Sequence, residues 1–285
     1  MKLVKYLFEY ILIIILFILF KILGYRIASD FGCFLGKTFG PFFRSKEVIK
    51  DNLLKFDDTL TPEKLNNISE EMWGNYGRIL SEYPYISNFR KGDLDKYIKI
   101  ENIETLDEIK KGPPVIFVSA HFSNFELMAM VIEKAGINLS AIYRPLNNKL
   151  VNSIMEPIRK KYICKNQIKK GINGVRESLK FFKQGTSVAI MIDQRVSEGE
   201  SLKFFNHHAK TTTIPAQLVK KYRCRVVPVY IERKNKHNFK ISFHNPIKFD
   251  DKFSVKEISL KLNKVLEKMI LKNPEQWIWT HDRWK

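Results

Sequence analysis

PPVIFVSAHFSNFELMAMVIEKAG, from Pro113 to Gly136, passes from one type of secondary structure to another within a few residues. Val115–Val118 is a short apolar run rich in valine and isoleucine, which is typical of a buried strand. A helical pattern follows and reaches Gly136, a residue type that commonly ends helices. A buried strand followed at once by a helix indicates the first half of a strand–helix–strand unit.

The same alternation continues from Lys96 towards the C-terminus. The segments with strand character are YIKIEN, LSAIYR, TSVAIMID and CRVVPVYIE, and those with helical character are LDEIKKG, NKLVNSIMEPIRKKY, INGVRESLKFFKQG, IPAQLVKKY and SVKEISLKLNKVLEKMILKN. Earlier in the chain, helices are expected near Lys46–Lys55 and from Pro62 to Tyr83, with Thr61 as the N-cap of the second. Strands that alternate with helices predict an α/β fold with a mostly parallel central sheet flanked by helices.

The N-terminal segment YLFEYILIIILFILFKILGY, Tyr6 to Tyr25, is almost entirely apolar. About 20 apolar residues suffice to cross a hydrocarbon core. We therefore predict one transmembrane anchor over residues 1–24 and a single main domain over residues 25–285. A cleaved signal peptide is the alternative, although no small-residue cleavage site follows the segment. The aromatic residues of Phe31–Phe43 either lie along a membrane surface or pack inside the domain.

The composition restricts the partners of the chain. Lysine and arginine exceed aspartate and glutamate by 49 to 30, so the formal net charge is +19. Such an excess favours an anionic membrane surface, a nucleic acid, or an acidic protein or substrate. The predicted anchor and the lack of a recognisable reader module argue against nucleic acid. Cys33, Cys164 and Cys224 form no CxxC pair, so neither a disulfide framework nor a zinc site is expected.

Two interpretations fit His121 and Glu126, which stand where the strand ends and the helix begins. Ser123-x-x-Glu126 matches a capping box, in which the serine oxygen accepts from the backbone of Glu126 and the glutamate reaches back. That explains Glu126 without chemistry, but it does not explain His121. At the carboxyl edge of a parallel sheet, beside a carboxylate that fixes its tautomer, His121 is suited to act as a general base. Asp193 also directly follows a predicted strand.

Four motifs occur in order along the chain: GPPVIFVSAHFSNFEL, IYRPLNN, IMIDQR and PEQWIWTHDRW. Together they resemble the bacterial lipid A biosynthesis acyltransferases, the late lauroyl- and myristoyl-type enzymes of the glycerolipid acyltransferase superfamily. The resemblance extends from about Gly24 to Lys285. Three residues depart from the types that the family resemblance implies at their positions: Arg195, His207 and His208.

The resemblance implies a single-pass protein of the bacterial inner membrane, with its anchor in residues 1–24 and an acyltransferase catalytic domain, residues 25–285, facing the cytoplasm. It implies transfer of a fatty acyl chain from acyl carrier protein to a hydroxyl of a lipid A precursor. The family uses a histidine–carboxylate dyad, which here is His121 held by Glu126. It implies neither a metal nor a cofactor.

Arg159 matches the family's functional arginine, with Arg144 as a competing match, and Asp193 matches its aspartate. With no second carboxylate at ligand spacing, we expect Asp193 to contact substrate or order a loop rather than bind a metal. We place Arg144 and Lys170 with them as substrate-binding residues, and expect the surrounding cationic stretch to contact acceptor phosphates. That stretch comprises Arg159, Lys160, Lys161, Lys165, Lys169, Lys170 and Arg176. Other basic surfaces are expected to contact the acidic carrier protein or anionic membrane lipids, or to be merely solvated.

Several alternatives stay open at this point. The acceptor is either a lipid A precursor or another lipid, such as a lysophospholipid or a glycolipid. A thioesterase would pass the acyl group to water, and a non-catalytic protein would only bind anionic lipid. Acyl carrier protein and coenzyme A are both possible donors. Residues near the dyad either line an acyl-chain slot or pack in the core: Phe122, Phe125, Leu127 and Met128. The C-terminal tryptophans either contact the membrane interface or seal the sheet edge: Trp277, Trp279 and Trp284.

Overall fold

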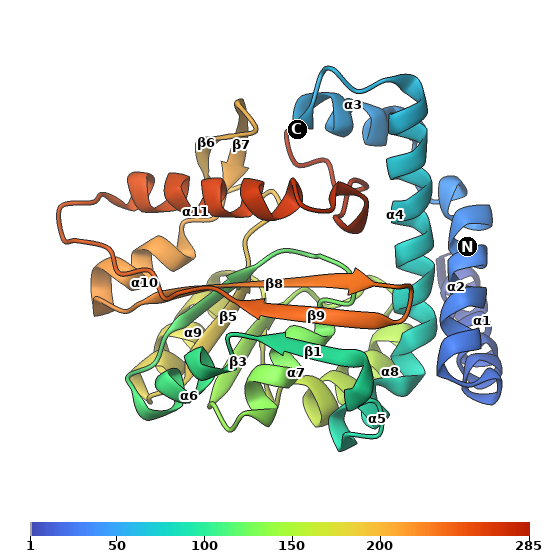
Figure 1. The fold of residues 1–285 in the computed structure, drawn as a ribbon, viewed down its shortest axis with the longest axis horizontal. Coiled ribbons are helices and arrows are strands. Elements are labelled where there is room, and N and C mark those ends of the chain that lie inside the picture. Colours follow the sequence, from blue (N-terminus) through green and yellow to red (C-terminus); the bar gives the residue numbers. More distant parts are fainter. Residues whose placement is uncertain (1) are drawn as a thin grey trace.

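A seven-stranded sheet lies at the centre of the computed structural model (Figure 1). The structure describes residues 2–285, so Met1, the first residue of the predicted anchor, lies outside the described residues. The strand order is β1-β9-β8-β2-β5-β3-β4. The strands are β1 (Ile98–Glu101), β2 (Ile116–Ser119), β3 (Leu139–Tyr143), β4 (Asn166–Lys169), β5 (Ser187–Met191), β8 (Val226–Lys234) and β9 (Asn238–Phe243). Every neighbouring pair is parallel except β8 and β9, which confirms the predicted mostly parallel sheet.

β2 occupies the middle of this sheet because its side chains are apolar enough to be buried on both faces. All four of its residues are buried, with β5 on one side and β8 on the other. Strands of parallel sheets are covered on both faces and therefore read as continuous apolar runs. This burial places the carboxyl end of β2, and the residues that follow it, at an edge of the sheet.

Several strands were not predicted because their own sequences carry little strand signal. β4 reads NQIK, and β9 reads NFKISF. β6 (Glu200–Phe204) and β7 (His207–Thr211), ESLKF and HHAKT, form a separate antiparallel pair that contains the two unusual histidines. Strand formation depends on the neighbour that a strand packs and pairs with, so such segments are recognised only in their tertiary context.

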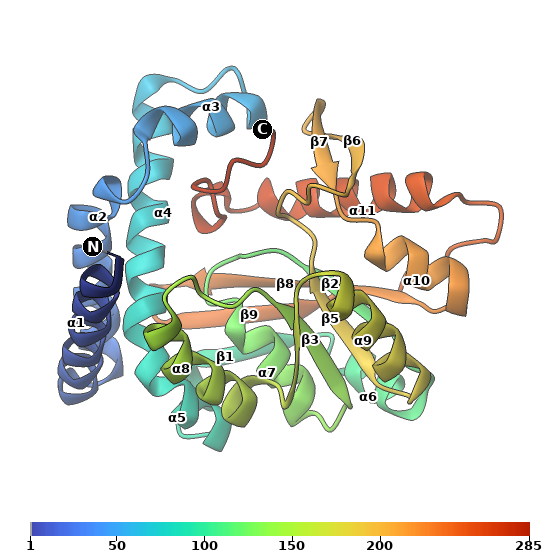
Figure 2. The same ribbon diagram turned by 180° about the vertical axis from the view of Figure 1, so that it is seen from behind.

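Helices cover both faces of the sheet. α11 (Val255–Ile270) lies above β8 in Figure 1, whereas α7 (Glu126–Lys134) lies below it, and Figure 2 shows the same layers from behind. The remaining helices that alternate with strands are α6 (Ile103–Lys111), α8 (Lys149–Ile158), α9 (Ile172–Lys183) and α10 (Ile214–Tyr222). Each corresponds to a predicted helical segment. Ser254 and Glu257 form a complete capping box at the start of α11, which explains where that helix begins.

α4 (Pro62–Glu82) and α2 (Tyr25–Phe39) form a tightly packed pair beside the sheet (Figure 1). A Cβ atom at Gly77 would overlap the carbonyl oxygen of Gly32, and one at Gly36 would overlap the backbone of α4. These glycines are required because the two backbones approach too closely for any side chain. Two shorter helices and four 3₁₀ turns complete this region and the C-terminal segment: α3 (Lys46–Phe56), α5 (Ile86–Lys91), η1 (Gly40–Phe42), η2 (Tyr83–Tyr85), η3 (Asp95–Tyr97) and η5 (Pro274–Gln276).

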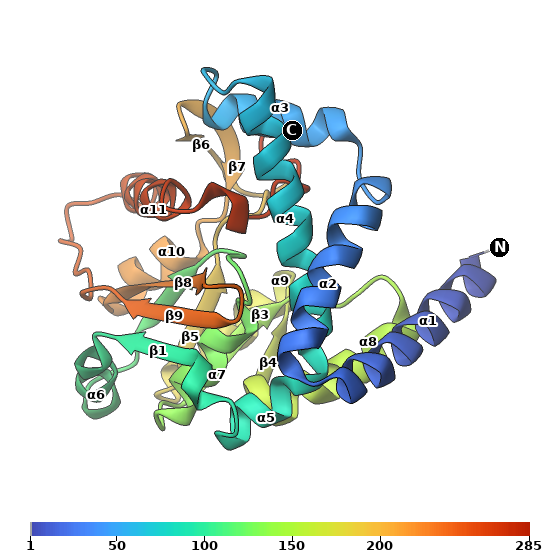
Figure 3. The same ribbon diagram turned by 45° about the vertical axis from the view of Figure 1, so that its right-hand side comes forward.

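α1 (Lys2–Leu23) is the one helix among residues 2–285 that is long and apolar enough to cross a membrane. Figure 3 shows it projecting from the domain beside α2 and α8. One of its faces is attached to the domain: Tyr85 Oη donates to the carbonyl of Phe20 at 2.5 Å, and Asn148 Nδ2 donates to Glu9 Oε2 at 2.8 Å. The opposite face exposes Leu3, Val4, Leu7, Phe8, Ile11, Leu12, Ile15, Ile18, Leu19 and Ile22. The helix is therefore held on one side and bare and apolar on the other.

The aromatic segment after α1 is packed in part and exposed in part. Phe31 and Leu35 pack against the core. Phe42 and Phe43 are 86% and 81% exposed, and Phe34 and Phe39 are also exposed. The segment forms the end of α2 and the turn η1, and these exposed side chains give it an apolar surface.

Candidate active site

His121 and Asp193 meet at the carboxyl edge of two neighbouring strands. β2 ends at Ser119 and β5 ends at Met191, and these two residues are partners in the parallel register. The chain leaves both strands in the same direction, so His121 and Asp193, each the second residue after its strand, emerge side by side. The backbone N–H of His121 donates to Oδ2 of Asp193 at 2.9 Å, and Nδ1 of its ring lies 2.9 Å from Oδ1.

Asp193 is fully buried, with 0% of its surface exposed. Trp277 Nε1 donates a further hydrogen bond to its Oδ2 at 3.0 Å. Burial raises the pKa of this carboxyl, but the charge and hydrogen bonds of His121 outweigh that effect and lower the pKa to about 2. A carboxylate that is enclosed and already bonded in this way has no surface to offer a substrate. The expectation that Asp193 binds substrate is therefore corrected: its contact is with His121.

The carboxylate of Asp193 orients the ring of His121. A carboxylate oxygen only accepts hydrogen bonds, so Nδ1 carries the hydrogen and Nε2 of the neutral ring keeps its lone pair. Burial lowers the pKa of His121, but the charge and hydrogen bond of Asp193 outweigh burial, so the pKa lies above its usual value. The ring also packs edge-on against Phe125, with the ring centroids 4.8 Å apart. His121 is thus held in the tautomer and orientation that a general base requires.

Glu126 is paired with Arg159 instead of His121. Its Oε1 accepts from Nε of Arg159 at 2.8 Å and from Nη2 at 2.6 Å, and both side chains are largely buried. Arg159 opens a π-helical turn, η4 (Arg159–Ile163), directly after α8, and such turns occur frequently at functional sites. The expectation that Glu126 holds His121 is therefore corrected, because Asp193 occupies the ring nitrogen that a supporting carboxylate would contact.

The predicted capping box at the start of α7 does not form. α7 begins at Glu126 with Phe125 as its N-cap, and Phe125 has no side chain that accepts hydrogen bonds. Ser123 has a positive φ of 41°, and its buried hydroxyl has no hydrogen-bond partner within the described residues. Its backbone N–H donates to the carbonyl of Gln276 at 3.0 Å. The turn is shaped by this long-range contact and by the Arg159 pair, so the local capping pattern is misleading.

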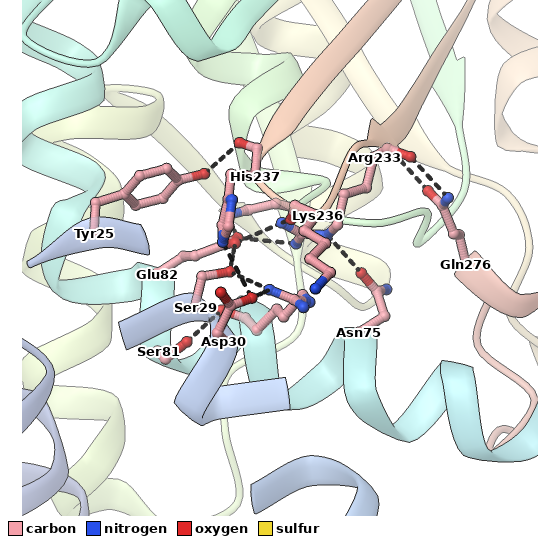
Figure 4. A network of polar contacts seen from close by, with 12 residues as sticks. Tyr25, Ser29, Asp30, Asn75, Ser81, Glu82, Arg233, Lys236, His237 and Gln276 are labelled. Carbon is pink, nitrogen blue, oxygen red and sulfur yellow. Dashed lines mark hydrogen bonds and ion pairs between the residues drawn. The ribbon is translucent and has the colours of Figure 1, made fainter. Parts of the chain in front are cut away.

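Figure 4 shows a buried polar network around Glu82 and Arg233. Asn124 and Ser123 link this network to the turn after β2. Asn124 Nδ2 donates to Oε2 of Glu82 at 3.0 Å, and Arg233 donates to both oxygens of Glu82 at 2.5 and 3.0 Å. Arg233 and Gln276 exchange two hydrogen bonds, at 2.7 and 3.1 Å, and Ser29 Oγ donates to Glu82 at 2.8 Å. The network thus joins α2, α4, the β8–β9 hairpin and the C-terminal segment to the turn that carries the histidine.

A cavity of about 660 Å³ opens beside His121, which is within the range of sites for small molecules and cofactors. Its apolar lining includes Phe125, Ala129, Ala141, Ile142, Ile163, Val175, Ala189, Ile190, Met191 and Ile214. Charged residues expected from the sequence also line it: Glu126, Arg144, Arg159 and Lys170. Of the four residues considered for an acyl slot, Phe125 lines the cavity, whereas the others are buried in the core: Phe122, Leu127 and Met128.

The C-terminal motif contributes residues whose roles were not predicted. Trp277, Trp279 and Trp284 are buried, so the interpretation that they contact a membrane interface is wrong. Trp277 instead bonds Asp193, and His281 lines the cavity beside His121. Their signal in the sequence is the motif PEQWIWTHDRW itself, but the side chain that each of them contacts depends on the fold.

Comparison with known proteins finds a matching family model and several related enzymes of one kind. The family model described as bacterial lipid A biosynthesis acyltransferase matches residues 1–285. The lipid A biosynthesis palmitoleoyltransferase of Escherichia coli (strain K12) is 25% identical over 262 residues, which cover 89% of this chain and 84% of that protein. The lipid A biosynthesis lauroyltransferase of the same organism is 24% identical over 273 residues, covering 92% of this chain and 87% of that protein.

Among solved structures, the 1-acyl-sn-glycerophosphate acyltransferase from Thermotoga maritima aligns with a TM-score of 0.43 and 14% sequence identity, covering 89% of this chain and 96% of that chain. The family model is the decisive finding, since it extends over every residue of the sequence and agrees with the motifs around His121 and Trp277. This chain therefore belongs to the bacterial lipid A biosynthesis acyltransferase family and is an acyltransferase.

Proposed function

We propose that this acyltransferase moves a fatty acyl chain from acyl carrier protein to a hydroxyl group of a lipid A precursor, with His121 as the general base. The names of the related E. coli enzymes support an acceptor of the lipid A type. The observation that carries the mechanism is the His121–Asp193 pair, because it leaves Nε2 free beside a largely apolar cavity. That combination suits a reaction between a hydroxyl and a thioester with a long acyl chain.

The reaction follows from the protonation state of His121. The neutral ring takes the proton of the acceptor hydroxyl at Nε2 while the hydroxyl oxygen attacks the carbonyl carbon of the thioester. Asp193 stabilises the imidazolium that forms. When the tetrahedral intermediate collapses, the C–S bond breaks, the ester forms, and the imidazolium returns the proton to the leaving thiolate. The proton taken from the acceptor hydroxyl thus ends on the leaving thiol, and the reaction needs no covalent acyl–enzyme intermediate.

Arg159 is proposed to stabilise the oxyanion of that intermediate. Its guanidinium lines the same cavity as His121, and positive charge held where negative charge develops is a major source of rate enhancement. Glu126 fixes the guanidinium through Nε and Nη2, so its effect on the reaction passes through Arg159.

We further propose that α1 is a single-pass anchor in the bacterial inner membrane and that the catalytic domain faces the cytoplasm. The bare apolar face of α1 and the exposed side chains of Phe42 and Phe43 support contact with lipid. The net charge of +19 favours attraction to anionic headgroups and to an acidic carrier protein. An anchored enzyme reaches a membrane-embedded acceptor without extracting it from the bilayer.

The test uses the purified full-length protein in lipid nanodiscs with an acylated carrier protein and a lipid A precursor. Mass spectrometry is expected to find the acceptor heavier by one acyl chain, and a well-folded His121→Ala protein is expected to form almost no product. A parallel reaction with an acyl coenzyme A tests the alternative donor. Release of free fatty acid without acylated acceptor would identify a thioesterase and overturn the proposal.

A further inference from the structure

A second cavity, of about 460 Å³, adjoins the one beside His121. Both cavities share the lining residues Arg144, Lys170, Val196, Glu198 and His281, so they lie next to each other. Five cationic side chains line the second cavity, which we call the cationic pocket: Arg44, Arg144, Lys170, Arg195 and Lys285. They come from five separate parts of the sequence, so their convergence is a product of the fold.

The charges of the cationic pocket are not compensated by the protein. The two acidic side chains of the lining are Glu198 and Asp282, so the cationic side chains outnumber the acidic ones. None of the five cations forms an ion pair within 4.0 Å with a residue of the described chain. Arg159 and Arg233, by contrast, each have a carboxylate partner. Clustered cations of this kind are stabilised by an anionic ligand.

Two features show that these cations lack compensating partners within the described part of the protein. The Nε atoms of Arg44 and Arg195 are buried and have no hydrogen-bond partner within residues 2–285. Burial and the charge of Arg144 lower the pKa of Lys170, as expected where like charges approach one another. Guanidinium groups bind phosphate in a two-pronged geometry, so arginines with free nitrogen atoms at a cavity suit a phosphate group.

His281 stands between the two cavities and lines both of them. Its Nε2 accepts a hydrogen bond from the backbone N–H of Arg195 at 2.9 Å. Burial lowers the pKa of His281 to about 4, so the ring is neutral at pH 7 and Nδ1 carries its proton. An uncharged donor therefore separates the catalytic base from the cationic pocket and is available to a hydroxyl or phosphate oxygen of a bound molecule.

We propose that the cationic pocket binds a phosphate group of the acceptor lipid and thereby places the acceptor hydroxyl at Nε2 of His121. The inference rests on the proposed transfer to a lipid A precursor and assigns the acceptor side of that site to Arg44, Arg195 and Lys285, with Arg144 and Lys170. A phosphomonoester carries a charge of about −1.5 to −2 at pH 7, which matches the excess positive charge of the pocket better than one carboxylate does. Arg159 lines the other cavity and not the cationic pocket, and its proposed role there is at the oxyanion.

The experiment compares Arg195→Gln and Lys285→Gln with Lys183→Gln, which removes an exposed cation that lines neither cavity. Steady-state kinetics are measured with full-length protein in nanodiscs, varying an acceptor with its phosphate groups, the same acceptor after phosphatase treatment, and the acyl donor separately. Arg195→Gln is expected to raise the KM for the phosphorylated acceptor about tenfold or more, the size of a lost charge-assisted hydrogen bond. Lys285→Gln is expected to act in the same direction, and Lys183→Gln to change nothing.

The dephosphorylated acceptor distinguishes the possible outcomes. It is expected to be a poorer substrate for the wild-type protein and to be almost unaffected by Arg195→Gln, because the interaction is already lost. A rise confined to the donor KM would assign the pocket to the phosphate that links a carrier protein to its thiol arm, and would overturn the proposal. Unchanged kinetics in folded variants would overturn it as well. Wild-type protein that acylates neither acceptor would instead refute the proposed function, which is a separate result.

Discussion

The carboxylate of Asp193 and the imidazole of His121 form a buried pair in which Oδ1 lies 2.9 Å from Nδ1 and Oδ2 accepts the backbone N–H of the same histidine at 2.9 Å. Side chain and backbone are held together, so the ring has one orientation and one neutral tautomer. The register of β2 and β5 creates the pair, whereas Glu126, five residues after His121, has its own partner in Arg159.

Removal of the base tests the role of His121 directly. His121→Ala is expected to lower kcat by about 10²–10⁴-fold, the usual contribution of a general base. The melting temperature is expected to fall as well, because the buried carboxylate of Asp193 loses its partner. Acyl transfer followed by mass spectrometry gives the rate, and circular dichroism confirms the fold. Turnover close to that of the wild type in a folded His121→Ala protein would exclude the mechanism.

The pH profile tests the pair. Activity requires the neutral ring, and Asp193 raises the pKa of His121, so kcat/KM is expected to rise with pH through a midpoint above 6.5. In Asp193→Asn the negative charge is lost while burial still lowers the pKa. The midpoint is then expected to move to lower pH, with a reduced plateau because the imidazolium loses its stabilisation. A midpoint that stays in place would show that Asp193 does not act on the ionisation of His121.

The Glu126–Arg159 pair is expected to affect both stability and rate. Glu126→Gln keeps an accepting oxygen but removes the charge that holds a largely buried guanidinium. A hydrogen bond to a charged group contributes about 1.5–3 kcal/mol, so the free energy of unfolding is expected to fall by that amount. The rate is expected to fall as well, and Arg159→Lys combined with Glu126→Gln should cost less than the sum of both changes. Additive losses would mean that the two residues act independently.

Arg233 tests whether the network of Figure 4 positions the catalytic turn. Arg233→Met leaves the fully buried carboxylate of Glu82 without its partner, a change that typically costs about 3–5 kcal/mol. Because Glu82 and Gln276 also bond the backbone or side chains of the turn, kcat is expected to fall more than the KM values rise. Arg233→Lys keeps the charge and should recover part of both losses. A less stable protein with an unchanged kcat would show that the network has only a structural role.

The close contact of α2 with α4 depends on Gly77, which has no side chain. Gly77→Ala places a methyl group against the backbone of Gly32 and is expected to destabilise the fold by about 1–3 kcal/mol or more, as overpacking does. Asn66→Ala, at an exposed position of the same helix, is the control and should be almost neutral. Thermal unfolding of the two variants measures the difference. Equal stability would mean that the two helices separate without cost.

The proposed membrane anchor predicts that the full-length protein is harder to release from the bilayer than protein that lacks α1. Full-length protein is expected to stay in the membrane fraction in high salt and in alkaline carbonate. Protein that lacks α1 should remain partly bound through Phe42, Phe43 and the basic surface, and high salt should release much of it because screening weakens attraction to headgroups. Full-length protein recovered in the soluble fraction at low salt would contradict the anchor.

Local patterns in the sequence were sufficient for much of the fold. Buried strands such as Val115–Val118 and long amphipathic helices such as that of Val255–Ile270 are determined by apolar periodicity, which a chain carries in any context. Thr61 and Pro62 marked the start of α4 correctly, since an N-cap depends on neighbouring residues alone. His121, at the end of a buried strand, was found for the same reason, as was the apolar helix at the N-terminus.

The partners of these residues were decided by long-range packing. Asp193 contacts His121 because β5 lies next to β2, and no local pattern states which strands are neighbours. The capping box of Ser123 and Glu126 failed because Gln276 and Arg159, distant in sequence, offered stronger contacts. The cationic pocket also depends on long-range packing, since its five cations belong to five segments that approach one another only in the folded chain. Short-range geometry sets secondary structure, whereas burial and charge pairing across the sheet determine which side chains meet and therefore where the chemistry takes place.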